Sequence, residues 1–268
     1  MIEQIIDIAI NAGNIILDVK KKGYTVSTKS DLFDFVTTAD LESEKYILSR
    51  LKKEFPKDSI LSEEKGNASI NKSKNVWMID PLDGTKNFKN GGKGYAVMIG
   101  LCQNGKPILG VIYAPAMDML IYAQKGKGAY IRTNGKDKKL HVSNIKLMKD
   151  SKLITRVASS DVREEDKLYD YLDVKERIPE SSVGIKLGLI AEAKAEFHIS
   201  SNSKTSKWDT CAPQIILEEA GGLLTDIYGK PLDYNQKDSL WKLSFIASNK
   251  IIHQEIIKNI KEYYSLNN

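Results

Sequence analysis

The sequence predicts an α+β protein made of two layered α/β halves, the first around a mostly antiparallel β-sheet and the second around a mixed one. Three observations support this prediction. The chain has 268 residues, which is enough for one large domain or two modest ones. Residues 95–142 combine short apolar runs with tight-turn signals. After a polar stretch at residues 143–151, helical and strand-like patterns alternate. We therefore expect domains at residues 1–145 and 146–268.

Two amphipathic helices are predicted at the start of the chain. Apolar residues recur at helical spacing from Ile2 to Val19, and three lysines followed by Gly23 suit a helix C-terminus. A second helix is expected over residues 41–55, where Pro56 ends it.

Two buried strands are expected next, over residues 59–62 and 76–79. Each delivers acidic residues at its C-terminal end, because Glu63-Glu64 follow the first strand and Asp80 follows the second. Pro81 should stop the second run from continuing as a central strand, since proline cannot donate a hydrogen bond to the ladder.

An antiparallel sheet is predicted from Tyr95 to about Val142. Asn104-Gly105 and Asn134-Gly135 are strong signals for tight hairpin turns. The strands expected here cover residues 95–103, 107–115, 119–123 and 129–133.

The second half of the chain alternates strand and helix patterns. The expected strands cover residues 153–159, 196–200, 223–227 and 243–248. The expected helices cover residues 182–195, 211–222 and 251–264. His141, His198 and His253 occur in strand-like or surface-helix settings, so we interpret all three as structural.

The composition is that of an ordinary globular protein. With 41% hydrophobic residues the chain can bury a core, which excludes disorder as its main state. Lys+Arg 40 against Asp+Glu 35 gives a net charge of +5. This excess is too small and too dispersed for a nucleic-acid-binding surface, but it favours anionic small molecules. Cys102 and Cys211 lie in apolar runs and are interpreted as reduced core thiols.

Targeting signals are not evident in the sequence. No segment approaches the roughly 18 apolar residues that a membrane span requires. The apolar N-terminal segment contains Glu3 and Asp7 and has neither a basic region nor a small-residue cleavage site, so it does not match a signal peptide. We therefore expect a cytoplasmic protein.

Residues 77–88 form the most informative segment for function. Asp80 and Asp83 lie around a proline turn with the Leu82 carbonyl between them, and oxygen ligands of this kind suit Mg²⁺. Gly84 would let the backbone approach a ligand closely, and a helix starting there would turn its first amides toward a phosphate. The alternative is an Asp-Gly turn with solvated acids, which this pattern taken alone favours.

Three other acidic positions have structural explanations when each is taken alone. Glu63-Glu64 fits a solvated loop, Asp40 complements the dipole of the second helix, and Asp209 is a candidate N-cap just before an apolar helix. Their joint occurrence in one chain favours a common site.

Four motifs carry these acids in a fixed order. They are Thr37-Thr38-Ala39-Asp40, Ser62-Glu63-Glu64, Asp80-Pro81-Leu82-Asp83-Gly84-Thr85 and Trp208-Asp209-Thr210-Cys211-Ala212. In these motifs the sequence resembles the lithium-sensitive, magnesium-dependent phosphomonoesterase superfamily, which includes inositol monophosphatases and 3'(2'),5'-bisphosphate nucleotidases. The resemblance covers nearly the whole chain. It implies a layered αβαβα sandwich of two sheets and helices, the inositol monophosphatase-like sugar-phosphatase fold.

The resemblance also implies a metal site and a catalytic pair. Two or three Mg²⁺ ions would be held by Glu63, Asp80, Asp83, Asp209 and the carbonyl of Leu82. Asp40 and Thr85 would orient and deprotonate a water, with Glu63 also at the catalytic centre. Substrate contacts would come from Gly84, Thr85, Lys186 and Asp209. Without cations, so many carboxylates would raise each other's pKa, so the site should depend on Mg²⁺.

Details within the superfamily favour the bisphosphate nucleotidase branch. Lys86, the lysine-bearing helix of residues 186–195 and the segment of residues 207–213 resemble that branch. Lys186 would supply the cation that a second, uncleaved phosphate needs. Asn87-Phe88 instead resembles the inositol phosphatases.

Two departures from the nucleotidase pattern leave the substrate open. Ala158 and Val183 stand where nucleotidases often place polar residues. Arg156 and Lys204 are candidate substitutes for phosphate binding. These differences affect the identity of the substrate and not the metal chemistry.

The leading hypothesis is a Mg²⁺-dependent phosphatase that converts adenosine 3',5'-bisphosphate to AMP, with the sulfated precursor as a further candidate substrate. The alternative is an inositol monophosphatase or a broader sugar-phosphate phosphatase. A catalytically silent nucleotide or polyanion sensor is disfavoured, because every metal-site acid is present. The resemblance also implies inhibition by Li⁺ and a monomer or homodimer, with no nucleic-acid partner.

Overall fold

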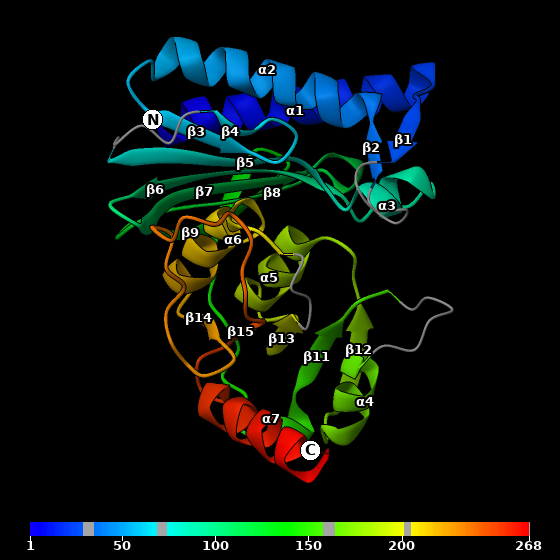
Figure 1. Ribbon diagram of the computed structural model, residues 1–268, viewed down its shortest axis with the longest axis vertical. Coiled ribbons are helices and arrows are strands. Elements are labelled where there is room, and N and C mark those ends of the chain that lie inside the picture. The colour runs from blue at the N-terminus through cyan, green and yellow to red at the C-terminus, as the bar shows by residue number, and fades with distance from the viewer. Residues whose placement is uncertain (29–34, 69–73, 158–163, 201–204, 268) are drawn as a thin grey trace.

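The protein is built from five alternating layers of helices and sheets (Figure 1). The computed structural model describes residues 1–28, 35–68, 74–157, 164–200 and 205–267. Helices α1 (Ile2–Lys22) and α2 (Thr38–Glu54) cover one face of an eight-stranded sheet, and α5 (Val183–Ala191) and α6 (Lys207–Glu219) cover the other. A five-stranded sheet follows, with α4 (Glu164–Tyr171) and α7 (His253–Asn267) on its far side. The predicted αβαβα sandwich is confirmed.

The first sheet runs in the order β10-β9-β8-β7-β6-β5-β3-β4. Its strands are β3 (Ser59–Ser62), β4 (Gly66–Ala68), β5 (Asn75–Asp83), β6 (Ala96–Gln103), β7 (Lys106–Ala114), β8 (Met119–Gln124), β9 (Gly128–Thr133) and β10 (Lys136–Lys139). Its described strand pairs are antiparallel except for β3 with β5. The Asn-Gly turns have positive φ at both positions, 50° and 75° at Asn104 and Gly105, as tight hairpins require. The mostly antiparallel sheet is therefore confirmed.

The second sheet runs in the order β12-β11-β13-β15-β14. Its strands are β11 (Lys152–Thr155), β12 (Glu176–Pro179), β13 (Phe197–Ser200), β14 (Leu223–Asp226) and β15 (Phe245–Ser248). Strand β11 pairs in parallel with both neighbours, and the other pairs are antiparallel, so the predicted mixed sheet is confirmed. The domain boundary at residue 145 stays a prediction, because α5 and α6 contact strands of both sheets.

Helix α6 lies very close to the first sheet because two strands carry glycine beneath it. A Cβ on Gly100 of β6 would lie 2.7 Å from Sγ of Cys211, and one on Gly110 of β7 would lie 2.5 Å from the carbonyl oxygen of Ala212. Cys102 and Cys211 are buried and free, as expected of core thiols. This close packing fixes the start of α6, where Asp209 lies.

The outer helices are amphipathic. Helix α1 buries Ile5, Ile8 and Ile16 in the core cluster beneath it, while its last turn carries the three expected lysines. None of the helices within the described ranges combines the length and the apolar character needed to cross a lipid bilayer.

Several short elements were not predicted from the sequence. They are β1 (Val26–Thr28), β2 (Phe35–Thr37), α3 (Thr85–Lys89), β4, β10, α4, β12 and the 3₁₀ turns at Pro115–Met117 and Met148–Asp150. Strand β1 is exposed along its whole length, and three of the four residues of β12 are exposed. Such strands have too few buried positions to produce the period-two pattern that identifies a strand.

Several helix boundaries differ from the predictions, and α7, for example, covers His253–Asn267 and not residues 251–264. Helix α2 begins at Thr38 and not at residue 41, and α6 begins at Lys207 and not at residue 211, because Thr37 and Ser206 precede them as capping residues. Helix α5 ends at Ala191 and not at residue 195, and Ala193 has a left-handed φ of 59° that ends the helical run. The strand expected over residues 153–159 is β11, which ends at Thr155, and residues 158–159 lie outside the described residues.

The histidines make contacts that suit structural roles. His198 is buried, with its Nδ1 2.8 Å from the carbonyl oxygen of Ile154, whereas His141 is exposed. His253 is 1% exposed and lies 2.8 Å from the hydroxyls of both Thr225 and Ser248. Because Thr225 donates its own proton to a carbonyl, Nε2 of His253 must donate to Thr225, which leaves Nδ1 to accept from Ser248.

This arrangement predicts an acid-sensitive contribution to stability. Burial lowers the pKa of His253 from 6.5 to about 4. Between pH 4 and pH 6.5, His253 is therefore protonated in the unfolded chain but neutral in the folded protein. The contribution of the neutral His253 ring to the unfolding free energy is complete above pH 6.5 and is lost as the pH falls toward 4. We expect the unfolding free energy in urea to fall by about 2 kcal/mol more between pH 7 and pH 5 in the wild type than in His253→Gln. An identical pH dependence in the two proteins would contradict this assignment.

Candidate active site

The start of α2 holds the carboxylate of Asp40 in a fixed position. Asp40 is the third residue of the helix and is fully buried. Its Oδ2 accepts hydrogen bonds from the backbone N–H of Thr37 at 2.8 Å and from the Thr37 hydroxyl at 2.5 Å. Asp40 therefore completes a capping box with Thr37, which satisfies donors that the helix start would otherwise leave open.

The other oxygen of Asp40 faces Thr85. The Thr85 hydroxyl lies 3.0 Å from Oδ1 of Asp40 and 3.0 Å from the carbonyl oxygen of Leu82, and its single proton can go to either. Burial raises the pKa of the Asp40 carboxyl, although the Thr37 and Thr85 hydrogen bonds oppose this shift. A buried carboxylate with a raised pKa is a stronger base than a solvated one, and it is hydrogen-bonded here to a hydroxyl that is partly exposed.

Pro81 does not end its strand, contrary to the prediction. Strand β5 continues to Asp83 through a break in register between Asp80 and Asp83, where it pairs only with β6. The irregularity provides the place for a proline that a regular central strand lacks. The Ser43 hydroxyl of α2 donates to the Pro81 carbonyl at 2.9 Å, which ties the irregular segment to the helix.

Gly84 makes the turn that follows. Its φ of 88° is left-handed, and a Cβ would lie 2.6 Å from the carbonyl oxygen of Gly94, so only glycine fits without a shift. Helix α3 begins at the next residue, Thr85, as the phosphate-facing interpretation of Gly84 and Thr85 requires.

Asp83 connects β5 to the start of α5. Its Oδ2 accepts hydrogen bonds from the Ser182 hydroxyl and from the backbone N–H of Gly184 at 2.8 Å. Burial raises the pKa of Asp83 to about 6, while these bonds and the nearby charge of Lys186 act in the opposite direction. The start of a helix from the second half of the chain therefore binds a carboxylate of the first half.

Asp209 repeats the arrangement of Asp40 at the start of α6. It is the third helical residue, and its Oδ2 accepts a hydrogen bond from the backbone N–H of Ser206 at 2.5 Å. It lies inside the helix and is not the N-cap that the sequence suggested, because the helix begins four residues earlier than expected. The cap is Ser206.

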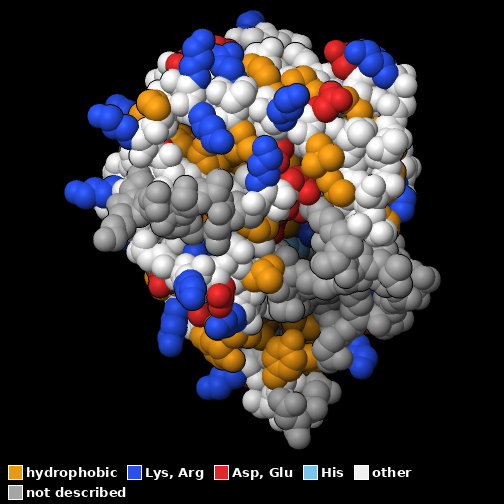
Figure 2. Space-filling model, turned by 45° about the horizontal axis from the view of Figure 1, so that its top comes forward, with side chains coloured by type: hydrophobic (Ala, Val, Ile, Leu, Met, Phe, Trp, Pro, Cys, Tyr) orange, Lys and Arg blue, Asp and Glu red, His pale blue; other side chains and the backbone are white. Residues whose placement is uncertain are grey.

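The acids of these segments act on each other through their charges. The pKa of Asp80 is raised well above its usual range, first by burial and then by Glu63, Asp83 and Asp209. The pKa of Asp209 is raised by burial and by Glu63 and Asp83, and a hydrogen bond with Asp80 partly opposes this shift. Figure 2 shows acidic side chains gathered along a hollow near the centre of one face, with lysine and arginine side chains on the surrounding surface.

This donor set fits a divalent cation. Within the described residues, no three histidine, cysteine, aspartate or glutamate side chains are arranged as a ready-made metal group. The charge of Glu63 nevertheless raises the pKa of Asp80 and of Asp209, which come from separate segments, and a hard cation with oxygen ligands would remove that cost. Glu63, Asp80, Asp83 and Asp209 are the residues that could hold it. The Leu82 carbonyl lies between Asp80 and Asp83 in the chain and 3.0 Å from the Thr85 hydroxyl.

Lys186 is buried and lies near the acidic group. It is 6% exposed on α5, and its charge lowers the pKa of both Asp83 and His198. Lys186 is therefore not a solvated lysine on the helix surface. Arg156 pairs with Asp166 at 2.6 Å.

Val183, the first residue of α5, has its backbone N–H hydrogen-bonded to Asp83, which opposes the rise in the pKa of that carboxyl. Glu64 is half-buried in the turn after β3. Ala158 and Lys204 lie outside the described residues.

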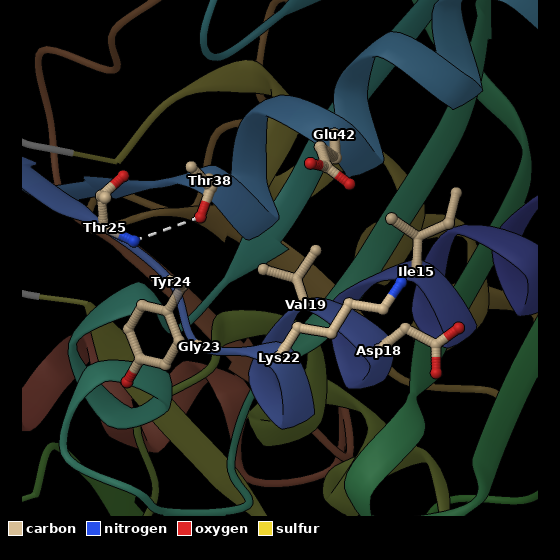
Figure 3. Close-up of a pocket in the computed structure, with 9 residues that line it drawn as sticks. All are labelled: Ile15, Asp18, Val19, Lys22, Gly23, Tyr24, Thr25, Thr38 and Glu42. Atoms are coloured by element: carbon tan, nitrogen blue, oxygen red, sulfur yellow. Dashed lines mark hydrogen bonds between the residues drawn. The ribbon is translucent and has the colours of Figure 1, made fainter.

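A separate cavity of about 630 Å³ lies on the other side of the start of α2 (Figure 3). Ile15 and Val19 of α1, Tyr24, and Thr38 and Glu42 of α2 are among its lining residues. None of the acids described above lines it. The Thr25 N–H donates to the Thr38 hydroxyl at 3.3 Å, which joins the residue before β1 to the first turn of α2.

Sequence reasoning missed the residues that hold the acids in place. Ser43, Ser182 and Ser206 bind the Pro81 carbonyl, Asp83 and Asp209 respectively. Ser206 had a detectable signal, because a serine three residues before an acid and an apolar run is a capping box. Nothing in the sequence links Ser43 to Pro81, because they meet only through the packing of α2 on β5.

The chain is similar to known proteins over nearly its whole length. Residues 1–265 match the model of the inositol monophosphatase family. The chain is 33% identical to the 3'(2'),5'-bisphosphate nucleotidase CysQ of Aggregatibacter actinomycetemcomitans, over 92% of this chain and 91% of the relative. It is 31% identical to inositol monophosphatase 1 of Homo sapiens, over 96% and 92%. Among solved structures, Thermotoga maritima IMPase TM1415 superposes with a TM-score of 0.84 at 27% identity, covering 97% of this chain and 96% of that one.

The charge repulsion in the site predicts a characteristic response to Mg²⁺. At pH 8 without divalent cations, we expect Asp80→Asn to unfold about 2–4 °C above the wild type, since it removes one buried charge worth about 1 kcal/mol. Saturating Mg²⁺ should raise the unfolding temperature of the wild type and raise that of the variant much less.

The matched control is Asp226→Asn, which changes a buried aspartate outside the site. Asp226 accepts hydrogen bonds from Tyr228 and Lys230, so this variant should be destabilised yet keep the full response to Mg²⁺. Scanning calorimetry with and without Mg²⁺ measures both effects. An equal Mg²⁺ response in wild type and Asp80→Asn would refute the cation assignment.

Proposed function

The chain belongs to the inositol monophosphatase family, and on that basis we propose that it is a Mg²⁺-dependent phosphatase that hydrolyses the 3'-phosphate of adenosine 3',5'-bisphosphate. The products are AMP and phosphate. The observation that carries this proposal is the Asp40–Thr85 hydrogen bond beside a buried group of mutually repelling carboxylates.

The carboxylates form the cation site in this proposal. Glu63, Asp80, Asp83, Asp209 and the Leu82 carbonyl hold two or three Mg²⁺ ions. When bound, Mg²⁺ neutralises the phosphate, lowers the pKa of a water and stabilises the leaving oxygen. Asp83 and Asp209 are held by donors at the starts of α5 and α6, so both have defined positions before any ligand arrives.

Asp40 and Thr85 act on the attacking water. Thr85 accepts the proton of the water at Oγ1 as it passes its own proton to Oδ1 of Asp40. Thr37 keeps the opposite oxygen of Asp40 in place with two donors, so the carboxylate cannot turn away. The raised pKa of Asp40 suits a group that must accept a proton at neutral pH. The chain needs no covalent nucleophile for this reaction, because positioning and charge neutralisation account for most of the rate.

Lys186 supports a substrate with two phosphates. It is a buried cation on α5, one turn beyond the residues that bind Asp83. A phosphate that is not cleaved requires a positive partner near the metal site, and Lys186 is placed close enough to influence Asp83 electrostatically. The segment around it also resembles the nucleotidases more than the inositol phosphatases.

Inositol monophosphate is the second candidate substrate. The identities to the bacterial nucleotidase and to the human inositol phosphatase differ by only two percentage points, from 33% to 31%, and both relatives cover nearly the whole chain. Asn87-Phe88 in helix α3 matches the inositol phosphatase pattern. One consequence is shared by both substrates, since Li⁺ binding at a carboxylate position should inhibit either reaction.

The catalytic pair gives a direct test by substitution at Thr85. Thr85→Val keeps the branched shape but loses the hydroxyl, so we expect kcat to fall about 10²–10⁴-fold. Thr85→Ser keeps the hydroxyl and should retain most of the rate. Phosphate release at saturating Mg²⁺ and substrate measures both variants. A Thr85→Val enzyme within about threefold of the wild type would exclude a role for this hydroxyl.

The choice of substrate is tested by comparing esters. With purified protein and Mg²⁺, we expect a higher kcat/KM for adenosine 3',5'-bisphosphate than for inositol 1-phosphate. Lys186→Met should raise KM for the bisphosphate about 10- to 100-fold, the usual worth of a charged hydrogen bond, and leave inositol 1-phosphate nearly unaffected. Lys194→Met is the matched control, because Lys194 is exposed just beyond α5 and pairs with Glu192. A preference for inositol 1-phosphate would overturn the nucleotide assignment while leaving the phosphatase chemistry intact.

A further inference from the structure

We propose that Glu44 is a positioning residue that fixes the Glu63 carboxylate for Mg²⁺ binding. This inference rests on the proposed role of Glu63 as a metal ligand. Glu44 belongs to α2, lies outside the four sequence motifs and is 1% exposed. It reaches the site through the turn that carries Glu63, and not by direct contact with substrate.

One oxygen of Glu44 holds both ends of that turn. Oε1 accepts a hydrogen bond from the Ser62 hydroxyl at the end of β3 and another from the backbone N–H of Lys65 at 3.1 Å. The turn consists of residues 63–65, so Ser62 directly precedes it and Lys65 is its last residue. The Glu63 N–H also donates to the Ile79 carbonyl of β5 at 3.2 Å. The backbone of Glu63 is therefore held from two sides, by α2 and by β5.

Glu44 is one of three residues through which a single helix positions the site. Asp40, Ser43 and Glu44 lie within about one turn of α2, so their side chains share one face. They bind Thr85, the Pro81 carbonyl and the Ser62–Lys65 turn respectively. Farther along, α2 buries Ile47, Leu48 and Leu51 in the core, which keeps the helix from shifting. Helix α2 is thus the common support of three separate segments.

The chemistry of Glu44 indicates a functional reason for a carboxylate here. A buried acid adds negative charge to a region where Glu63 already raises the pKa of Asp80 and Asp209. Stability alone would favour a neutral acceptor. A carboxylate accepts stronger and shorter hydrogen bonds than an amide does, so it holds the turn more firmly. Partners that orient a metal ligand commonly change metal affinity about 10–100-fold when removed.

The competing explanation is that Glu44 only stabilises the β3–β4 hairpin. In that case its removal lowers the unfolding temperature but leaves the Mg²⁺ affinity of the folded protein unchanged. Mg²⁺ affinity measured on the intact chain, without substrate, therefore separates the two explanations.

The test uses titration calorimetry with Mg²⁺ alone on four variants. Glu44→Ala should bind Mg²⁺ about 10–100-fold more weakly. Glu44→Gln keeps an acceptor for Ser62 and Lys65 but a weaker one than the carboxylate, so it should bind Mg²⁺ about 3- to 10-fold more weakly than the wild type. Glu42→Ala is the matched control, because Glu42 is exposed on the same helix and faces the separate cavity of Figure 3. It should bind Mg²⁺ as the wild type does. Glu63→Ala should lose most of the affinity.

The outcomes distinguish this inference from the proposed function. If Glu63→Ala weakens Mg²⁺ binding and a folded Glu44→Ala does not, the positioning role is wrong and the metal site stands. If Glu63→Ala binds Mg²⁺ as the wild type does, the metal site fails and this inference fails with it. Should Glu44→Ala lose cooperative unfolding, Ser62→Ala decides, with about 3- to 10-fold weaker binding expected for one lost hydrogen bond and unchanged binding overturning the proposal.

Discussion

The repulsion among buried carboxylates is the constraint on which the rest of the structure depends. Burial raises the pKa values of Asp80, Asp83 and Asp209, and neighbouring acids raise those of Asp80 and Asp209 further. Without an opposing interaction, such carboxylates would move apart or become protonated. The fold instead holds them together, at a cost to stability that helix starts reduce and that a bound cation would reduce further. The proposed cation and the proposed reaction both follow from that arrangement.

Helix starts provide the main opposing interaction. Asp40 and Asp209 occupy the third positions of α2 and α6, and Asp83 accepts the Gly184 N–H at the start of α5. The positive ends of three helix dipoles are thus directed at three acids, which favours their charged forms. In the αβαβα sandwich, α5 and α6 lie between the two sheets and α2 lies on the opposite face of the first sheet (Figure 1). Helix starts therefore reach the site from both faces of that sheet. The layered arrangement therefore positions the helix starts at the site, in addition to enclosing a core.

The layers and the hairpins could be predicted from the sequence, and the candidate acids could be named from it, but the contacts that hold those acids could not. Apolar periodicity and Asn-Gly turns identify elements because each depends on neighbouring residues, as the turn at Asn104 does. The exposed strand β1 leaves no such pattern. The prediction that Pro81 ends its strand was wrong, because a break in register accommodates this proline within β5. The contacts from Ser43, Glu44 and Ser182 join residues 18 or more positions apart, and only the packed structure pairs them.

Crystals grown with Mn²⁺ in place of Mg²⁺ and measured at the manganese absorption edge test the central claim most directly. Mn²⁺ takes similar oxygen ligands and gives an anomalous signal that locates it without prior assumptions. We expect anomalous peaks within coordination distance of Glu63, Asp80, Asp83, Asp209 and the Leu82 carbonyl. Peaks elsewhere, with these carboxylates bound to no metal in crystals that contain Mn²⁺, would contradict it.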